Sequence, residues 1–265
     1  THSTVGASVI KRRKICPGSR REEAKHPNQS SKYASEGTMA HALGEHCINK
    51  QRKPQELVGE EFVYEDHGAM KAGVVTDEMA DAVAVYVDWV NANFDPTTDT
   101  LLLEQKFHLK TVHPDLFGTS DCVIWKPATS TLICADYKHG AGVPVEVIGN
   151  PQPRYYSLGA LTTNRWPATT VRMAIIQPRC VHPDGPVRTE DIDALDLIDF
   201  AAELVSIVKD TEDPDAPLEP SEECRFCNAA PHCPALHSKS TEVAKIEFGA
   251  MLSYDPQKLA DTLAW

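Results

Sequence analysis

The segment TLICADYK, residues 131–138, decides how this chain folds. Its first five residues are apolar or β-branched and predict a buried strand. Because side chains alternate along a strand, we expect Asp136 and Lys138 on one face and Tyr137 on the other. A buried charge without a partner is costly, so the simplest explanation of this pair is a salt bridge at the end of the strand. A catalytic role is indicated only if other functional residues lie close to this pair.

The neighbouring segments predict that this strand belongs to a sheet. Short apolar segments bounded by turn residues predict further strands over residues 101–109, 120–126 and 171–177, and residues 127–130 predict a hairpin turn. Helical spacing and capping residues predict helices over residues 36–50, 77–93, 150–164 and 189–210, with Ser35, Asn150 and Thr189 as N-caps. This order of elements predicts an α/β fold in which helices flank a mixed central sheet.

The length and composition are sufficient for one large core. The chain has 265 residues, of which 42% are hydrophobic. We expect one domain over residues 1–238 and a tail over residues 239–265, with a short helix from Asp255. The sequence contains no run of about 20 apolar residues and no signal-peptide pattern, so we expect a protein without membrane contact, in the cytoplasm of a bacterial or phage-infected cell.

The net charge of −12 argues against a nucleic-acid partner at first, but the acidity is local. Residues 190–223 carry thirteen Asp or Glu residues and one Lys, which leaves the rest of the chain neutral. The start of the predicted helix at residue 189 explains part of this excess. Basic residues cluster near the start of the chain, and we interpret them either as a solvated arm or as contacts to DNA phosphates. They include Lys11, Arg12, Arg13 and Lys14.

Two aspartates in the predicted hairpin indicate a metal site. Asp121 lies near the start of one strand and Asp136 near the end of the next, so the hairpin can bring the two carboxylates together. Two carboxylates repel each other unless a cation lies between them, and Mg²⁺ prefers oxygen ligands such as these and the Tyr137 carbonyl. Lys138 would orient or deprotonate a metal-bound water, or offset charge on a phosphate.

These residues resemble a known superfamily of enzymes. Asp121 followed by Asp136-Tyr137-Lys138, within this order of helices and strands, resembles the PD-(D/E)XK nuclease superfamily, and more closely its RecB-like branch, to which phage lambda exonuclease is related. His41, in EGTMAH, lies where that branch has a histidine metal ligand. Gln152 and Tyr156, one helical turn apart, match a further motif of the branch. The resemblance covers residues 8–237 and extends to a phage-encoded family placed in this superfamily.

The resemblance implies a PD-(D/E)XK fold and a DNA nuclease that depends on Mg²⁺ or Mn²⁺. An exonuclease of phage or bacterial recombination or end processing is the main expectation. A structure-specific endonuclease or nickase, or a non-catalytic DNA-binding scaffold, is the alternative. The expected partners are DNA and a single-strand-annealing or recombination protein, and the oligomeric state stays open. The implied site residues are His41, Asp121, Asp136, Tyr137, Lys138, Gln152 and Tyr156.

Three glutamates near these residues have several interpretations. We interpret Glu104, in the first strand, as one member of a surface salt bridge, with metal ligation and a DNA contact as alternatives. Glu36 and Glu45 flank His41 in sequence. A metal-bound histidine usually donates its other N–H to an oxygen, so one of these two glutamates is expected to accept that hydrogen bond.

The cysteines near the C-terminus predict a second metal site. Cys224, Cys227 and Cys233 have a spacing typical of metal ligands. The resemblance implies Cys16 as the fourth ligand of a [4Fe–4S] cluster, with zinc as the alternative and His232 or His237 as its fourth ligand. Either centre would join the two ends of the domain. We interpret the other four cysteines as ordinary core or surface residues: Cys47, Cys122, Cys134 and Cys180.

Overall fold

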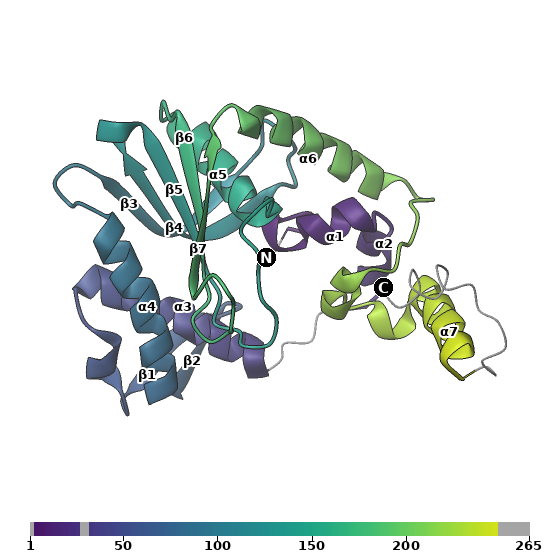
Figure 1. Cartoon of the computed structure of the whole chain (residues 1–265), viewed down its shortest axis with the longest axis horizontal. Coiled ribbons are helices and arrows are strands. Elements are labelled where there is room, and N and C mark those ends of the chain that lie inside the picture. The colour runs from purple at the N-terminus through teal and green to yellow at the C-terminus, as the bar shows by residue number, and fades with distance from the viewer. Residues whose placement is uncertain (1–2, 27–31, 249–265) are drawn as a thin grey trace. The chain divides into compact units, whose positions relative to one another are not determined.

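The computed structural model describes residues 3–26 and 32–248 (Figure 1). The helix predicted from Asp255 lies outside these residues. Within them, every helix is too short or too polar to span a bilayer. The chain divides into two compact units, which we call the first unit (Thr1–Ala7 and Ser30–Glu203) and the second unit (Ser8–Gln29 and Leu204–Trp265). This division does not follow the boundary expected at residue 238.

A five-stranded mixed sheet forms the centre of the first unit. Its strand order is β3-β4-β5-β6-β7. Neighbouring strands are antiparallel except β5 and β6, which are parallel. The bounds are β3 Thr100–His108, β4 Phe117–Lys126, β5 Thr131–Tyr137, β6 Thr170–Ile176 and β7 Val187–Asp193. The four predicted strands and the hairpin between β4 and β5 are thus confirmed, as is the mixed α/β architecture.

Helix α5 (Pro151–Asn164) connects the two parallel strands, which need a crossover of this kind. The Asn150 side chain accepts a hydrogen bond from the Gln152 N–H at 2.9 Å, which confirms the predicted cap. Pro151 occupies the first turn, where its missing N–H has no cost. Helix α5 packs against β3, β4, β5 and β6.

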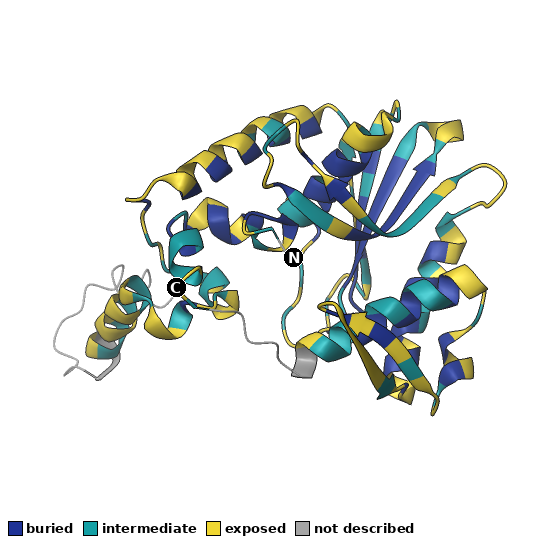
Figure 2. Ribbon diagram, turned by 180° about the vertical axis from the view of Figure 1, so that it is seen from behind, coloured by how far each residue is buried: buried dark blue, intermediate teal, exposed yellow. Residues whose placement is uncertain are grey.

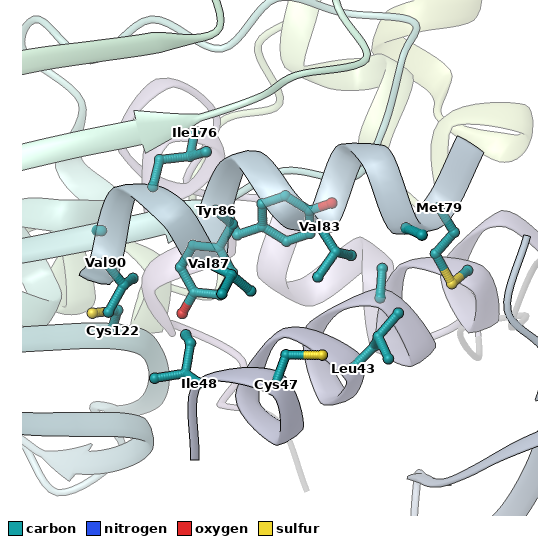
Figure 3. Packing of buried hydrophobic residues seen from close by; sticks show 14 of the residues in the cluster. Leu43, Cys47, Ile48, Met79, Val83, Tyr86, Val87, Val90, Cys122 and Ile176 are labelled. Atoms are coloured by element: carbon teal, nitrogen blue, oxygen red, sulfur yellow. The ribbon is translucent and has the colours of Figure 1, made fainter. Parts of the chain in front are cut away.

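Helices α3 (Lys32–Lys50) and α4 (Asp77–Asn93) pack together in the main core of the first unit. Their apolar side chains, among them Leu43 and Tyr86, meet strand residues such as Cys122 and Ile176 (Figure 3). Helix α5 contributes no residue to this cluster, so it covers the opposite face of the sheet. The sheet is thereby covered on both sides, and β5, β6 and residues 120–125 of β4 are almost entirely buried (Figure 2).

The helix predicted over residues 189–210 begins later than expected. Residues up to Asp193 form β7, and helix α6 runs over Asp196–Glu212. Exposure alternates along β7, so Asp191 and Asp193 are exposed whereas Glu190 is half-buried and pairs with Arg154 of α5 at 3.4 Å. Arg172 of β6 pairs with Asp191 through two hydrogen bonds of 2.7 Å, so the acidic residues that suggested a helix start serve the sheet instead.

The start of α3 and a small hairpin also differ from the prediction. Helix α3 begins at Lys32, and Ser35 lies inside it, where its hydroxyl donates to Asp66 Oδ2 at 2.9 Å. Asp66 ends strand β1 (Glu61–Asp66), which pairs with β2 (Ala69–Val74) in a two-stranded sheet. This hairpin was not predicted because its second strand is largely exposed and has no apolar alternation. Short 3-10 helices cover Ala7–Val9, Pro54–Leu57 and Pro127–Thr129.

The second unit combines segments from near both ends of the chain. It contains α1 (Ile10–Ile15), α2 (Ser19–Glu23), the end of α6 and α7 (Pro234–Phe248), with 3-10 helices η4 (Glu222–Phe226) and η5 (Ala230–His232). The Gly18 N–H donates to the Pro217 carbonyl at 2.9 Å, and the Arg21 guanidinium donates to the Ala216 carbonyl at 3.3 Å. Hydrogen bonds to main-chain carbonyls of the late segment therefore hold the early segment, which carries Gly18 and Arg21, in place.

Two helical glycines of the first unit, one in α5 and one in α3, provide a matched test of how these helices pack. A Cβ at Gly159 of α5 would lie 2.7 Å from the Phe107 Cβ, whereas one at Gly37 of α3 would have no atom within 4 Å. We expect Gly159→Ala to lower the free energy of unfolding by about 1–3 kcal/mol through overpacking. Gly37→Ala should raise it by about 0.5–1 kcal/mol, because alanine favours the helix. Urea denaturation measures both, and equal effects of the two changes would contradict this packing.

Candidate functional site

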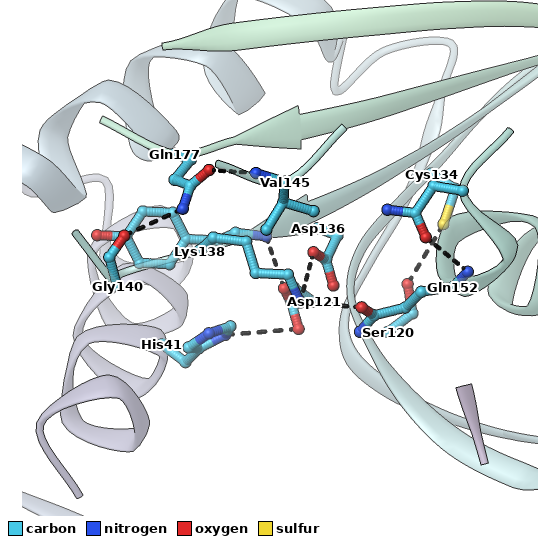
Figure 4. Close-up of polar contacts among 12 residues, drawn as sticks. His41, Ser120, Asp121, Cys134, Asp136, Lys138, Gly140, Val145, Gln152 and Gln177 are labelled. Carbon is cyan, nitrogen blue, oxygen red and sulfur yellow. Dashed lines mark hydrogen bonds and ion pairs between the residues drawn. The ribbon is translucent and has the colours of Figure 1, made fainter. Parts of the chain in front are cut away.

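The pairing of β4 with β5 positions the acidic residues of the site. Cys122 pairs with Ala135, which places Asp121 beside Asp136 on the neighbouring strand. The Tyr137 N–H donates to Asp121 Oδ2 at 2.7 Å (Figure 4). The hydroxyl of Tyr86 donates to the Asp121 carbonyl at 3.2 Å. Both the carboxylate and the main chain of Asp121 are therefore fixed.

Three ligand-type side chains meet at Asp121. His41 Nδ1 lies 3.4 Å from Asp121 Oδ1 and 3.5 Å from Glu104 Oε1. In the described ranges, these form the only set of three or more His, Cys, Asp or Glu residues whose ligand atoms all lie within 4.8 Å of one another. One imidazole nitrogen with carboxylate oxygens suits Mn²⁺, and the oxygens suit Mg²⁺. The expected proximity of His41 and Asp121 is thus confirmed.

Glu104 reaches this set through an unusual backbone conformation. Its φ is 44°, in the left-handed region that non-glycine residues rarely adopt, although it lies within β3. Before it, Leu101 and Leu103 pack against the α3–α4 core, but after it Phe107 lies beneath Gly159 of α5. The strand therefore reverses its facing at Glu104, at a strain of about 1–3 kcal/mol. The structure places Glu104 with the metal-type ligands and not in a surface salt bridge.

Lys138 and Asp136 form an ion pair beside this set. Lys138 Nζ lies 2.8 Å from Asp136 Oδ2 and donates to Gln152 Oε1 of α5 at 3.0 Å (Figure 4). Tyr156 is buried one turn further along α5. The predicted facing of Asp136 and Lys138 is confirmed. Asp136 does not join the three ligand-type residues, because its carboxylate is engaged by Lys138.

Tyr137 points to the other face, as predicted. Its ring is fully buried, stacks on Tyr86 with 5.1 Å between ring centroids, and meets the edge of the His41 ring at 5.3 Å. The contact with His41 fixes the orientation of that imidazole. The Tyr137 N–H is bound to Asp121. The metal-binding role expected for the Tyr137 carbonyl stays a prediction.

The buried charges shift one another's pKa values. Burial lowers the pKa of His41, but the carboxylates of Asp121 and Glu104 outweigh it and raise that pKa to about 10. Burial raises the pKa of Glu104. Burial, opposed by Lys138 and reinforced by Asp121, raises the pKa of Asp136 to about 6. In Asp121 the charge of His41 outweighs burial and lowers the pKa. The carboxylates thus attract positive charge strongly, from a protonated imidazole or from a divalent cation.

A chain of hydrogen bonds supports the site from behind. The Tyr137 hydroxyl lies 2.9 Å from His139 Nδ1, and His139 Nε2 lies 3.2 Å from Glu36 Oε1. Arg179 donates to the same Glu36 oxygen at 2.8 Å. This chain ties the end of β5 to α3, the helix that carries His41. Glu36, one of the two glutamates expected to accept a hydrogen bond from His41, thus contacts His139 and Arg179 instead, and the expectation for Glu45 stays a prediction. Sequence reasoning missed His139 and Arg179, which have no recognisable motif.

The basic run is not the exposed surface that was expected. Arg12 and Arg13 are 6% and 3% exposed. Both pair with Glu23, at 3.0 and 2.6 Å. Lys11 pairs with the exposed Glu222 and with Glu223. The prediction of a DNA contact is therefore wrong for Arg12 and Arg13, because both are buried and already pair with Glu23 of α2.

Lys14, the fourth residue of the run, is exposed. A DNA contact by Lys11 or Lys14 stays a prediction.

Four cysteines line one cavity of the second unit: Cys16, Cys224, Cys227 and Cys233. Neither His232 nor His237 is among its lining residues, which favours Cys16 as the fourth ligand. The Glu219 N–H donates to Cys16 Sγ at 3.2 Å, and the Ser221 N–H donates to Cys224 Sγ at 3.3 Å. The remaining four cysteines of the chain are buried, as expected of core residues.

Comparisons with known proteins add a family and one structural similarity. The model of the family described as "Protein of unknown function (DUF2800)" matches residues 2–265. A solved structure titled "Crystal structure of SSO0001" is similar at 15% sequence identity, over 89% of this chain and 88% of that chain, with a TM-score of 0.35. A similarity of this size supports no argument about function.

The three ligand-type residues predict a measurable affinity for Mn²⁺. Replacing Glu104 by Gln keeps the size of the side chain but removes a charged ligand, so we expect Mn²⁺ affinity to fall at least about tenfold. Isothermal titration calorimetry measures this affinity. Glu56→Gln removes the same charge from an exposed residue of the 3-10 helix Pro54–Leu57, where it pairs with Arg52, and should leave the affinity unchanged. Equal affinities for the wild type and Glu104→Gln would contradict the assignment.

Proposed function

The chain belongs to the DUF2800 family, and we propose that it is a DNA nuclease of the PD-(D/E)XK superfamily that depends on Mg²⁺ or Mn²⁺. One observation carries the proposal: the set of His41, Glu104 and Asp121 lies directly beside the ion pair of Asp136 and Lys138. A simple salt bridge at the end of a strand would not require three ligand-type side chains beside it. Metal-dependent phosphodiester hydrolysis, in contrast, uses a cation site, and a second positive group next to it stabilises the charge that develops on the phosphate.

His41, Glu104 and Asp121 would hold the metal ion. Their donor set fits a divalent cation of the Mg²⁺ or Mn²⁺ type, and the strained backbone of Glu104 indicates that its position is functional. When bound, such an ion supplies a nucleophilic hydroxide at neutral pH and offsets the charge of the scissile phosphate. The protein holds these ligands in place through the hydrogen bonds to Asp121 and the ring contact to His41.

Lys138 is the second positive group. Asp136 and Gln152 hold its ammonium at 2.8 and 3.0 Å, so the amine has a fixed position on the side of the sheet that α5 covers. Burial lowers the pKa of Lys138, but Asp136 and Asp121 outweigh it and raise that pKa. The side chain therefore remains a cation. In this proposal it orients the attacking water and stabilises negative charge that develops on the phosphate.

The substrate class and mode of cleavage rest on the resemblance of the sequence motifs. We propose an exonuclease that acts on DNA ends during recombination or end processing, with a recombination protein as partner. An endonuclease or nickase would use the same residues. A non-catalytic scaffold is disfavoured because both aspartates, the lysine and the histidine are all present and are brought together.

We further propose that the cysteines of the second unit hold a [4Fe–4S] cluster. Thiolates around a single zinc ion lie about 3.8 Å apart, given a tetrahedral site with Zn–S distances of about 2.3 Å. In the described ranges, no three cysteine sulfurs come within 4.8 Å of one another. A four-iron cluster is larger than one ion and holds its thiolates further apart. The four cysteines in one cavity, with N–H groups donating to two of the sulfurs, suit such a cluster.

Loss of Lys138 should abolish DNA cleavage. We expect Lys138→Ala to lower the rate at least about a hundredfold in Mn²⁺, since it removes the positioned cation, while the protein stays folded. The assay follows release of nucleotides from end-labelled linear DNA. Closed circular DNA in parallel separates an exonuclease, which leaves it intact, from an endonuclease or nickase.

The matched control is Lys126→Ala. Lys126 pairs with Asp99 at 2.6 Å and is the last residue of β4, several residues after Asp121, so its loss breaks a similar ion pair away from the site. This variant should keep its activity. Wild-type activity in Lys138→Ala, or activity that persists in excess EDTA, would refute the proposed mechanism.

The cysteine site predicts a coloured protein. Anaerobically purified protein should absorb near ~400 nm and contain iron and sulfide. Cys233→Ala should lose most of its iron, whereas Cys180→Ala, which changes a cysteine outside the cavity, should retain it. Colourless protein with one tightly bound zinc ion would show that the cluster assignment is wrong.

A further inference from the structure

We propose that Arg12 is a cationic component of the four-cysteine site and raises the reduction potential of the metal centre held there. This inference rests on the proposed cluster and not on nuclease activity. It assigns a role to a residue that the sequence suggested as a DNA contact and that the structure places in the interior of the second unit.

Arg12 lines the same cavity as the four cysteines. The residue is only 6% exposed, and its Nη2 lies 3.0 Å from Glu23 Oε1. Its Nε is buried and has no hydrogen-bond partner among the residues that the structure describes. A buried N–H without a partner is costly, and natural proteins rarely leave one unsatisfied. A guanidinium that borders the cavity therefore has a free donor for an anionic group bound inside it.

Glu23 supplies the opposing charge beside the cysteines. Its carboxylate pairs with Arg12 at 3.0 Å and with Arg13 at 2.6 Å. The Asn228 N–H, next to Cys227 in the chain, donates to Glu23 Oε1 at 3.2 Å. Arg12 of α1 and Glu23 of α2 therefore place opposite charges near the cysteine segment, and the net field at the site depends on both residues.

The groups that line the cavity favour a metal centre with a net negative charge. Backbone N–H groups already donate to Cys16 and Cys224, and such donors favour sulfur that carries negative charge. Four thiolates give a [4Fe–4S] centre a net negative charge, which increases by one when it gains one electron. A nearby cation stabilises the reduced state more than the oxidised state. Because the Arg12 side chain is buried, its charge is screened less than a charge at the surface.

The test is a redox titration of the purified holoprotein with dithionite, which supplies the electron, followed by visible and electron paramagnetic resonance spectra. We expect Arg12→Gln to lower the midpoint potential so that the ratio of reduced to oxidised cluster at a fixed potential falls about tenfold, which corresponds to 59 mV for one electron. Arg12→Lys keeps the charge and should stay near the wild-type value. Glu23→Gln removes the opposing anion and should shift the potential upward.

The control is Lys14→Gln, which removes one positive charge from the same end of the chain at an exposed position. Solvent screens that charge, so the potential should not change. If Arg12→Gln does not fold, the upward shift of Glu23→Gln still tests the proposal. Unchanged potentials in both the Arg12 and Glu23 variants would overturn it. Wild-type protein without an iron–sulfur spectrum would overturn it together with the proposed cluster, while nuclease assays would still judge the first site independently.

Discussion

The hydrogen bond from the Tyr137 N–H to the Asp121 carboxylate is the contact on which the candidate site depends. It joins two neighbouring strands at the point where their regular pairing ends, and so it aligns the charged residues of β4 and β5. The alternation of β5 then directs Asp136 and Lys138 toward α5 and the Tyr137 ring toward α3 and α4. A shift of one residue in this pairing would turn every one of these side chains to the wrong face.

Helices α3 and α5 each supply a different side chain to the candidate site. Helix α5 supplies Gln152 to hold the ammonium, and α3 supplies His41 to the carboxylates. The chain of hydrogen bonds through His139 and Glu36 fixes α3 to the end of β5. The proposed active site would require its side chains to be held rigidly, and these helices provide such support.

Local pattern in the sequence was enough to predict the central strands, the crossover helix and the facing of Asp136 and Lys138. It was not enough for Glu104, because no alternation rule foresees a left-handed residue that reverses the facing of a strand. Residues 189–193 look like a helix start because they are acidic, yet a cross-strand arginine satisfies one of them in the sheet. The buried arginines were misjudged for a related reason: their partner, Glu23, lies one helix further along the chain, and only tertiary structure brings it close.

The composition of the second unit has a consequence for biosynthesis. Residues 8–26 leave the ribosome long before residues 204–248, against which they pack. The central sheet and its helices belong to a continuous stretch between these two segments, so they can fold while the early segment still waits for its partner. During that interval the Cys16 thiol lacks the three other cysteines of its cavity. Insertion of the metal centre proposed for this site would therefore be a post-translational event, and free thiols such as that of Cys16 would depend on a reducing environment until synthesis is complete.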